Sequence, residues 1–103
     1  METYITLLKF TDQGVASIQK SDARLHEIKH VFKKMKAEVV DFYLTLGEYD
    51  AVVISKAPDA ETIAKLALMI GSQGKIRTVT LRSFPEEEFR SIISALVPKK
   101  VKL

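Results

Sequence analysis

The sequence predicts an α+β domain built on a four-stranded antiparallel sheet. Three observations predict this class. Four short stretches are rich in β-branched and aromatic residues, two intervening stretches place apolar residues at helical spacing, and turn or capping residues separate the stretches. In chain order the stretches are strand, helix, strand, strand, helix, strand, and a further helical stretch follows the last strand.

The first half of the chain supplies two strands and a long helix. Residues 3–10 predict the first strand. Thr11 or Asp12 can cap the next helix, which we expect over residues 15–36 because its apolar residues fall on one face. The second strand is expected over residues 39–46.

A hairpin and a crossover helix follow. Gly47 supplies the positive φ that a tight turn requires, and the third strand is expected over residues 49–56. Asp59 caps a helix predicted for residues 60–70, and Gly71 is expected to end that helix.

The last strand is expected over residues 76–84, and Pro85 fits the first position of a final helix. Pro98 is expected to end that helix. The first six elements have the order of the ferredoxin-like fold, βαββαβ, with an extra C-terminal helix. We therefore expect a single domain over residues 1–97 and a basic tail over residues 98–103. The apolar stripe of the final helix is Phe89, Ile92, Ile93 and Leu96.

Composition limits the class of protein. The chain has 103 residues, no cysteine and a formal net charge of +3, so disulfides and cysteine metal sites are excluded. The start lacks the features of a signal peptide, no apolar run is long enough to span a membrane, and we expect a cytoplasmic protein. The lysines of the first helix and the tail indicate a solvated surface, or weak attraction to an acidic partner.

Alternation along the strands predicts which side chains face the helices. We expect the most apolar set to face them: Ile5, Leu7, Val40, Phe42, Leu44, Leu46, Val52, Ile54, Val79 and Leu81. The open face would then carry Tyr4, Thr6, Leu8, Phe10, Asp41, Tyr43, Tyr49, Ala51, Val53, Thr78, Thr80 and Arg82. Such a mixed surface is typical of an interface. It predicts a homodimer or larger even oligomer with sheets packed face to face; the alternative is a monomer whose last helix covers its own sheet.

Two packed sheets would enclose a small-molecule cavity with a few polar groups. Arg82 could anchor an anionic ligand there, or form an ion pair with Asp41. The candidate ligand-binding residues are Tyr4, Thr6, Asp41, Tyr43, Tyr49, Thr78, Thr80 and Arg82.

The segments 10–14, 46–50, 57–59 and 74–84 together resemble the GYD-domain family, whose motif corresponds here to Gly47, Tyr49, Asp50 and Arg77. The resemblance covers nearly the whole chain. It implies a ferredoxin-like fold of the dimeric α/β-barrel type and no particular activity. Asp50 and Tyr49 have two interpretations: a turn-forming pair that bonds backbone amides, or acid–base groups at the mouth of a cavity.

The segment His26-Glu27-Ile28-Lys29-His30 fits the H-E-x-x-H zinc pattern. We expect both imidazoles to be plain surface side chains, because they fall on the lysine-rich side of the helix and the chain holds no third histidine. No metal or cofactor is predicted, and no catalytic residue can be assigned.

Three functions remain as hypotheses. The leading one is a homo-oligomeric module that binds or senses a small molecule between its sheets. The second is a small enzyme of the barrel monooxygenase type that needs no cofactor, with candidate groups Tyr4, Asp41, Tyr43, Tyr49 and Asp50. The third is weak RNA binding on an aromatic sheet face formed by Tyr4, Phe10 and Tyr49; the interrupted platform makes nucleic acid the least expected partner.

Overall fold

The computed structural model describes residues 1–96. The expected tail and Pro98 lie outside the described residues. The elements, in chain order, are β1 (Glu2–Phe10), α1 (Asp12–Ala16), a 3₁₀ turn (Ile18–Lys20), α2 (Ser21–Lys34), β2 (Glu38–Leu44), β3 (Ala51–Ala57), α3 (Ala60–Ser72), β4 (Ile76–Ser83) and α4 (Glu86–Ser94).

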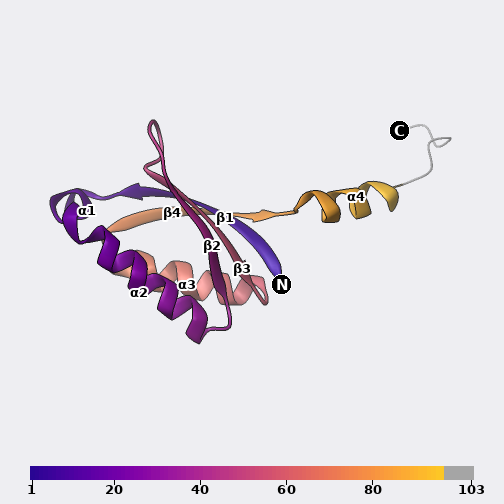
Figure 1. Cartoon of the computed structure of the whole chain (residues 1–103), viewed down its shortest axis with the longest axis horizontal. Helices are drawn as coiled ribbons and strands as arrows, with labels where there is room; N and C mark the ends of the chain where they lie inside the picture. Colours follow the sequence, from indigo (N-terminus) through magenta and orange to yellow (C-terminus); the bar gives the residue numbers. More distant parts are fainter. Residues whose placement is uncertain (97–103) are drawn as a thin grey trace.

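The four strands form one antiparallel sheet in the order β2-β3-β1-β4. Helices α2 and α3 lie side by side on one face of this sheet, and no helix within residues 1–96 covers the opposite face (Figure 1). We call these the helix-covered face and the open face. The α+β class and the ferredoxin-like order predicted from the sequence are confirmed.

The helix expected over residues 15–36 is interrupted in the structure. Thr11 caps α1 by accepting a hydrogen bond from Gly14 N, at 3.1 Å. The backbone then leaves the helical conformation at Ser17, whose carbonyl and hydroxyl oxygens accept hydrogen bonds from Arg24 at 3.1 and 3.3 Å. These bonds satisfy polar groups at the break, and α2 begins only at Ser21.

Two turns also differ from the prediction. Gly47 has the expected positive φ of 111°, but the hairpin loop is longer than two residues, because Thr45 N pairs with Asp50 O at 2.9 Å. Helix α3 continues through Gly71, and it is Gly74, with φ 77°, that makes the turn into β4. The expected caps at Thr11 and Asp59 are both present.

The predicted facing of three strands is wrong. Tyr4 belongs to the buried core beneath the helices, together with Phe32, Ala57 and Leu66. Because Tyr4 pairs with Ser55 and Arg82, the even-numbered residues of β1 and β4 and the odd-numbered residues of β3 share its face. Strand β2 has the predicted facing only in its second half, with Phe42 beside Val53 on the helix-covered face. A register shift between Val39 and Asp41 places Val39, and not Val40, against the helices, and Leu46 lies beyond the strand and is exposed.

The physical reason is the limited space under the helices. Ala51, Ser55 and Ala57 are almost fully buried there, and such small residues let α2 and α3 approach the sheet closely. The bulkier Val52 and Ile54 alternate with them and must point to the open face.

Helix α4 packs on neither face of its own sheet. It projects beyond the end of β4, away from the body of the domain (Figure 1). The Cα radius of gyration is 16.6 Å, against about 13 Å for a compact domain of this length. The four residues of its apolar stripe, Phe89, Ile92, Ile93 and Leu96, are all exposed.

Candidate functional site

The open face carries a continuous aliphatic patch. Ile5 lies between Ile54 and Leu81, and Leu7 lies between Val52 and Val79, in directly paired positions. Val79 and Leu81 are each 46% exposed. The six residues form two adjacent rows across three strands, and we call them the aliphatic patch. An apolar surface of this kind marks an interaction site.

Three of the predicted ligand-binding residues border this patch. Asp41 and Tyr43 lie on β2, opposite Ile54 and Val52. Tyr49 lies in the β2–β3 loop, where the Lys9 ammonium is 5.3 Å from the centre of its ring, within cation–π range. The rim of the open face is therefore polar and aromatic, while its centre is aliphatic.

The other five predicted ligand-binding residues lie on the helix-covered face. Tyr4, near the start of β1, pairs with Arg82, near the end of β4. Thr6, Thr78 and Thr80 lie further along the same two strands. The expectation that all eight residues surround one space between packed sheets is therefore wrong. The three threonines instead line a space within the single chain.

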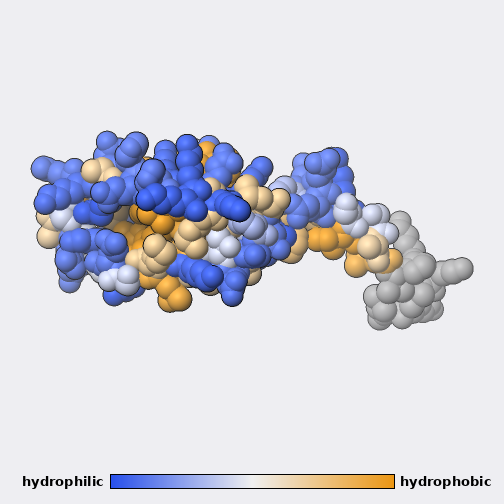
Figure 2. Space-filling view, turned by 90° about the horizontal axis from the view of Figure 1, so that it is seen from below, coloured by the Kyte–Doolittle hydropathy of each residue, from blue (hydrophilic) through white to orange (hydrophobic). Residues whose placement is uncertain are grey.

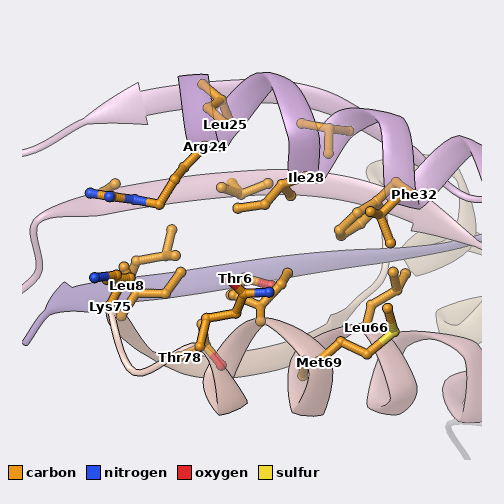
Figure 3. Close-up of a pocket in the computed structure, with 18 of the residues that line it drawn as sticks. Thr6, Leu8, Arg24, Leu25, Ile28, Phe32, Leu66, Met69, Lys75 and Thr78 are labelled. Carbon is orange, nitrogen blue, oxygen red and sulfur yellow. The ribbon is translucent and has the colours of Figure 1, made fainter. Parts of the chain in front are cut away.

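That space is a cavity of about 190 Å³ between the sheet, α2 and α3. The space-filling view shows an apolar hollow between two polar helix surfaces (Figure 2). Leu25, Ile28 and Phe32 enter it from α2, and Leu66 and Met69 enter it from α3 (Figure 3). Its walls are mostly apolar, with a few polar groups, which is the usual character of a ligand pocket.

One end of the cavity is cationic. Arg24 and Lys75 both line it, and their charged groups lie at the same end (Figure 3). A shallower hollow continues from there; it shares Arg24, Lys75 and the acidic Glu27 with the cavity and adds Lys20. The sequence prediction missed these residues because Arg24 and Glu27 lie in the first two turns of α2, Lys20 lies in the 3₁₀ turn before it, and Lys75 lies in the turn before β4. Their convergence depends on how the two segments pack.

The segments that resemble the family motifs meet at this end of the sheet. Thr11 donates from its hydroxyl to Gly74 O at 2.6 Å and from its backbone N to Lys75 O at 3.0 Å. Gly14 lies so close to Lys75 O that a Cβ would be only 2.0 Å away. Motif residues thus hold the turn that carries Lys75.

Asp50 has a structural role at the same end. Its carboxylate Oδ2 accepts a hydrogen bond from Phe10 N at 2.8 Å, and its backbone N donates to Leu8 O at 2.8 Å. These two bonds tie the hairpin loop to the C-terminal end of β1. Without the Asp50 carboxylate, the amide of Phe10 would lose its hydrogen-bond acceptor. The geometry supports the backbone-bonding interpretation of Asp50, with the amide supplied by β1. Arg77, the family-motif residue on β4, donates a hydrogen bond from its guanidinium to Gly71 O at 3.1 Å.

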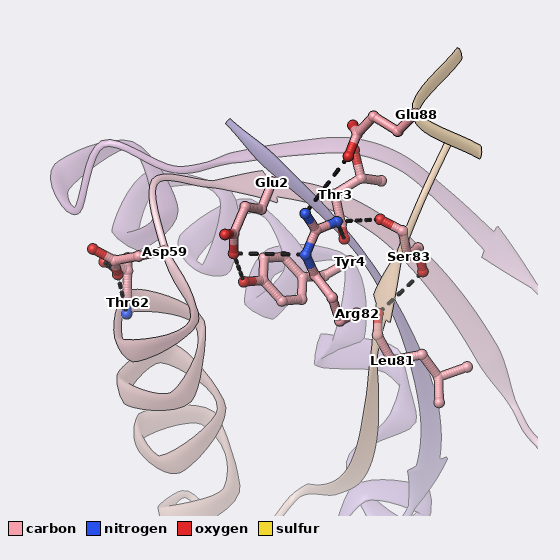
Figure 4. Close-up of polar contacts among 9 residues, drawn as sticks. All are labelled: Glu2, Thr3, Tyr4, Asp59, Thr62, Leu81, Arg82, Ser83 and Glu88. Atoms are coloured by element: carbon pink, nitrogen blue, oxygen red, sulfur yellow. Dashed lines mark hydrogen bonds and ion pairs between the residues drawn. The ribbon is translucent and has the colours of Figure 1, made fainter. Parts of the chain in front are cut away.

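Arg82 belongs to a separate polar cluster (Figure 4). Its guanidinium lies 3.7 Å from the carboxylate of Glu2 and 3.6 Å from that of Glu88, and Glu2 also accepts a hydrogen bond from Tyr4. Burial raises the pKa of Tyr4 to about 12, and the bond to Glu2 adds to the rise. The predicted alternative of an Asp41–Arg82 pair is wrong, because β2 and β4 are opposite edges of the sheet.

His26 and His30 are exposed on α2. Within residues 1–96, no group of three or more His, Cys, Asp or Glu side chains is placed to hold a metal ion. None of the helices in that range is both long enough and apolar enough to cross a membrane.

Comparison with known proteins identifies the class. The GYD domain family model matches residues 4–93, and the chain belongs to this family. It is 35% identical over 86 residues to a Thermus thermophilus protein named "Glutamine synthetase and cystathionine beta-lyase binding protein", covering 82% of this chain and 90% of the relative.

Among solved structures, the chain resembles the crystal structure of TTHA0845 from Thermus thermophilus, with a TM-score of 0.53 and 22% identity. The match covers 82% of this chain and 94% of that one, and it supports the fold alone.

Proposed function

We propose that this chain is a self-associating module that binds other proteins. The observation that carries the proposal is the aliphatic patch of Ile5, Leu7, Val52, Ile54, Val79 and Leu81 on the open face. Burying apolar surface stabilises association by about 25 cal/mol per Å². A second copy is the best-matched occupant, because two copies present sheet faces of the same shape and twist, and such faces pack at the usual spacing of about 10 Å.

Helix α4 extends the same interface. Four strands of seven to nine residues cover roughly 500 Å² in plan at the usual strand spacing and rise. A stable interface buries about 800 Å² per partner. The apolar stripe of α4 supplies further area, and because α4 projects away from its own sheet, it is free to contact the second copy.

The protein-binding part of the proposal rests on the relative. That protein is named for binding glutamine synthetase and cystathionine beta-lyase, so these two enzymes are the first partners to test here. We also expect both copies to work in the cytoplasm, where such metabolic enzymes would meet them.

The other hypotheses gain no support from the site. The candidate groups for an enzyme lie on both faces, with Asp50 bonded to backbone and Tyr4 buried. The aromatic platform for RNA is not formed, because Tyr4 and Phe10 face the helices. A small-molecule role is taken up below, at a different place from the one that the sequence predicted.

Sedimentation equilibrium tests self-association directly. We expect a dimer or larger even oligomer for the natural chain, and monomers for Leu81→Glu, which places a charge in the patch. Ala64→Glu is the matched control, because Ala64 is exposed on α3, and it should leave the assembly unchanged. A natural chain that stays monomeric at about 100 µM, well above the Kd of a stable interface, would refute the proposed assembly.

Partner binding needs a separate measurement. Biolayer interferometry with purified glutamine synthetase and cystathionine beta-lyase from the same organism should show saturable binding to at least one enzyme. No binding to either, by a chain shown to be folded and assembled, would contradict the transfer of this role from the relative.

A further inference from the structure

We propose that the cavity between the sheet, α2 and α3 binds a small carboxylate with an apolar body of about six carbons. This site lies on the opposite side of the sheet from the aliphatic patch. It therefore goes beyond the proposed function and can fail or succeed independently of it.

The size and lining of the cavity set the apolar body. The hollow opens to the surface (Figure 2), and its volume of about 190 Å³ is larger than the roughly 150 Å³ of an enclosed apolar cavity that holds benzene. Ile28, Phe32, Leu66 and Met69 supply walls of the same kind (Figure 3). Dispersion contacts with these walls favour a hydrocarbon ring or short chain over water.

The charges at one end of the cavity set the head group. Arg24 is held in place by bonds to Ser17 and to Ser21 Oγ, the latter at 3.2 Å, and neither it nor Lys75 forms an ion pair with any residue between 1 and 96. The charged groups facing this end are Lys20, Arg24, Lys75 and one acid, Glu27. Their sum is positive, so a carboxylate is favoured over an amine or an alcohol.

The floor of the cavity adds a polar feature. Thr6 and Thr80 are directly paired across β1 and β4, and Thr78 follows opposite Leu8. Within the described part of the chain, their hydroxyls take part in none of the side-chain hydrogen bonds. A ligand body with one hydroxyl or carbonyl group would find a partner there.

Amide chemical-shift titration of the ¹⁵N-labelled full chain tests the site with three probes of equal chain length. We expect saturable shifts for hexanoate at residues that line the cavity. Hexan-1-ol and hexylamine should bind at least about tenfold more weakly, because neither carries the negative charge that an ion pair with Arg24 or Lys75 requires, and the ammonium group of hexylamine is repelled by both.

Two kinds of variant locate the site. Lys75→Gln should weaken hexanoate binding several-fold and leave hexan-1-ol unchanged, whereas Lys33→Gln, at an exposed position of α2, should alter neither. Ala67→Leu fills the cavity from α3 and should abolish binding of both probes. Thr80→Ile fills it from the sheet and serves as the second filling variant if the first does not fold.

Three results would overturn the inference. One is hexanoate binding no tighter than hexan-1-ol. Another is probe binding that survives both filling variants. The third is a set of amide chemical shifts at the cavity residues that change with protein concentration and do not change with added probe, since a second copy would then cover the groove.

Discussion

Replacing Asp50 tests whether the most recognisable motif of the chain is structural. Asp50→Ala removes the acceptor of the 2.8 Å bond from Phe10 N. A hydrogen bond to a charged group contributes about 1.5–3 kcal/mol, and Asp50 is partly exposed, so we expect a loss of about 1.5–2 kcal/mol. Asp50→Asn keeps an acceptor and loses only the charge, so its cost should be about half as large.

The assay is chemical and thermal unfolding at one fixed protein concentration, because the stability of an oligomer depends on concentration. For a domain of this size, the expected loss lowers Tm by roughly 6–12 °C. Glu48→Ala is the matched control. Glu48 is exposed in the same loop, and its replacement should change stability by less than about 0.5 kcal/mol.

The reasoning fails if Asp50→Ala is as stable as Glu48→Ala. In that case the bond to Phe10 N contributes nothing, and the acid–base interpretation of the motif becomes the better one. A loss of stability without loss of partner binding supports the structural role.

Further predictions concern glycine, tyrosine and capping positions. Gly14→Ala should cost about 1–3 kcal/mol, because its Cβ would lie 2.0 Å from Lys75 O. Gly71→Ala should stabilise the protein by about 0.5–1 kcal/mol, because Gly71 lies in a helix with open space around it. Equal effects of the two variants on the unfolding midpoint would contradict this geometry. The pKa of Tyr4 is raised to about 12 from 10.0, so stability from this group is complete below about pH 10 and is lost as pH rises toward 12. Tyr4→Phe should therefore flatten the decline of the denaturation midpoint across that pH range, and in the natural chain the ultraviolet absorbance of tyrosinate should show one of the three tyrosines ionising late. Thr11→Ala should lower stability by about 1–2 kcal/mol through the lost cap, and Thr11→Ser should keep most of that stability. If Thr11→Ala unfolds at the same midpoint as the natural chain, the cap contributes nothing.

Local signals in the sequence located most elements well. Asp59 caps α3 as predicted, and Gly47 adopts the positive φ expected for the hairpin. These features depend on a few neighbouring residues, whose backbone preferences act over short distances. The break at Ser17 was missed because its bonds come from Arg24, seven positions along the chain.

The facing of the strands could not be obtained by ranking hydrophobicity. In β1, Tyr4, Thr6 and Leu8 alternate with Ile5 and Leu7, so both faces of the strand are largely apolar. Ranking by hydrophobicity predicts that Ile5 and Leu7 face the helices, but in the structure both belong to the aliphatic patch. The small residues Ala51, Ser55 and Ala57 on one face of β3 were the signal that could have corrected the assignment.

The fold and the candidate site both combine features set by local sequence with features set by tertiary packing. The sequence by itself determined the order of strands and helices, the capped termini and the turn glycines, because each depends on local backbone preference and on the period of the apolar pattern. Only the tertiary structure decided which face of each strand is buried, that α4 lies apart from its own sheet, and that Arg24 and Lys75 meet at one end of a cavity. These depend on how side chains far apart in the chain share the space between layers, and that space is filled at near-crystalline density.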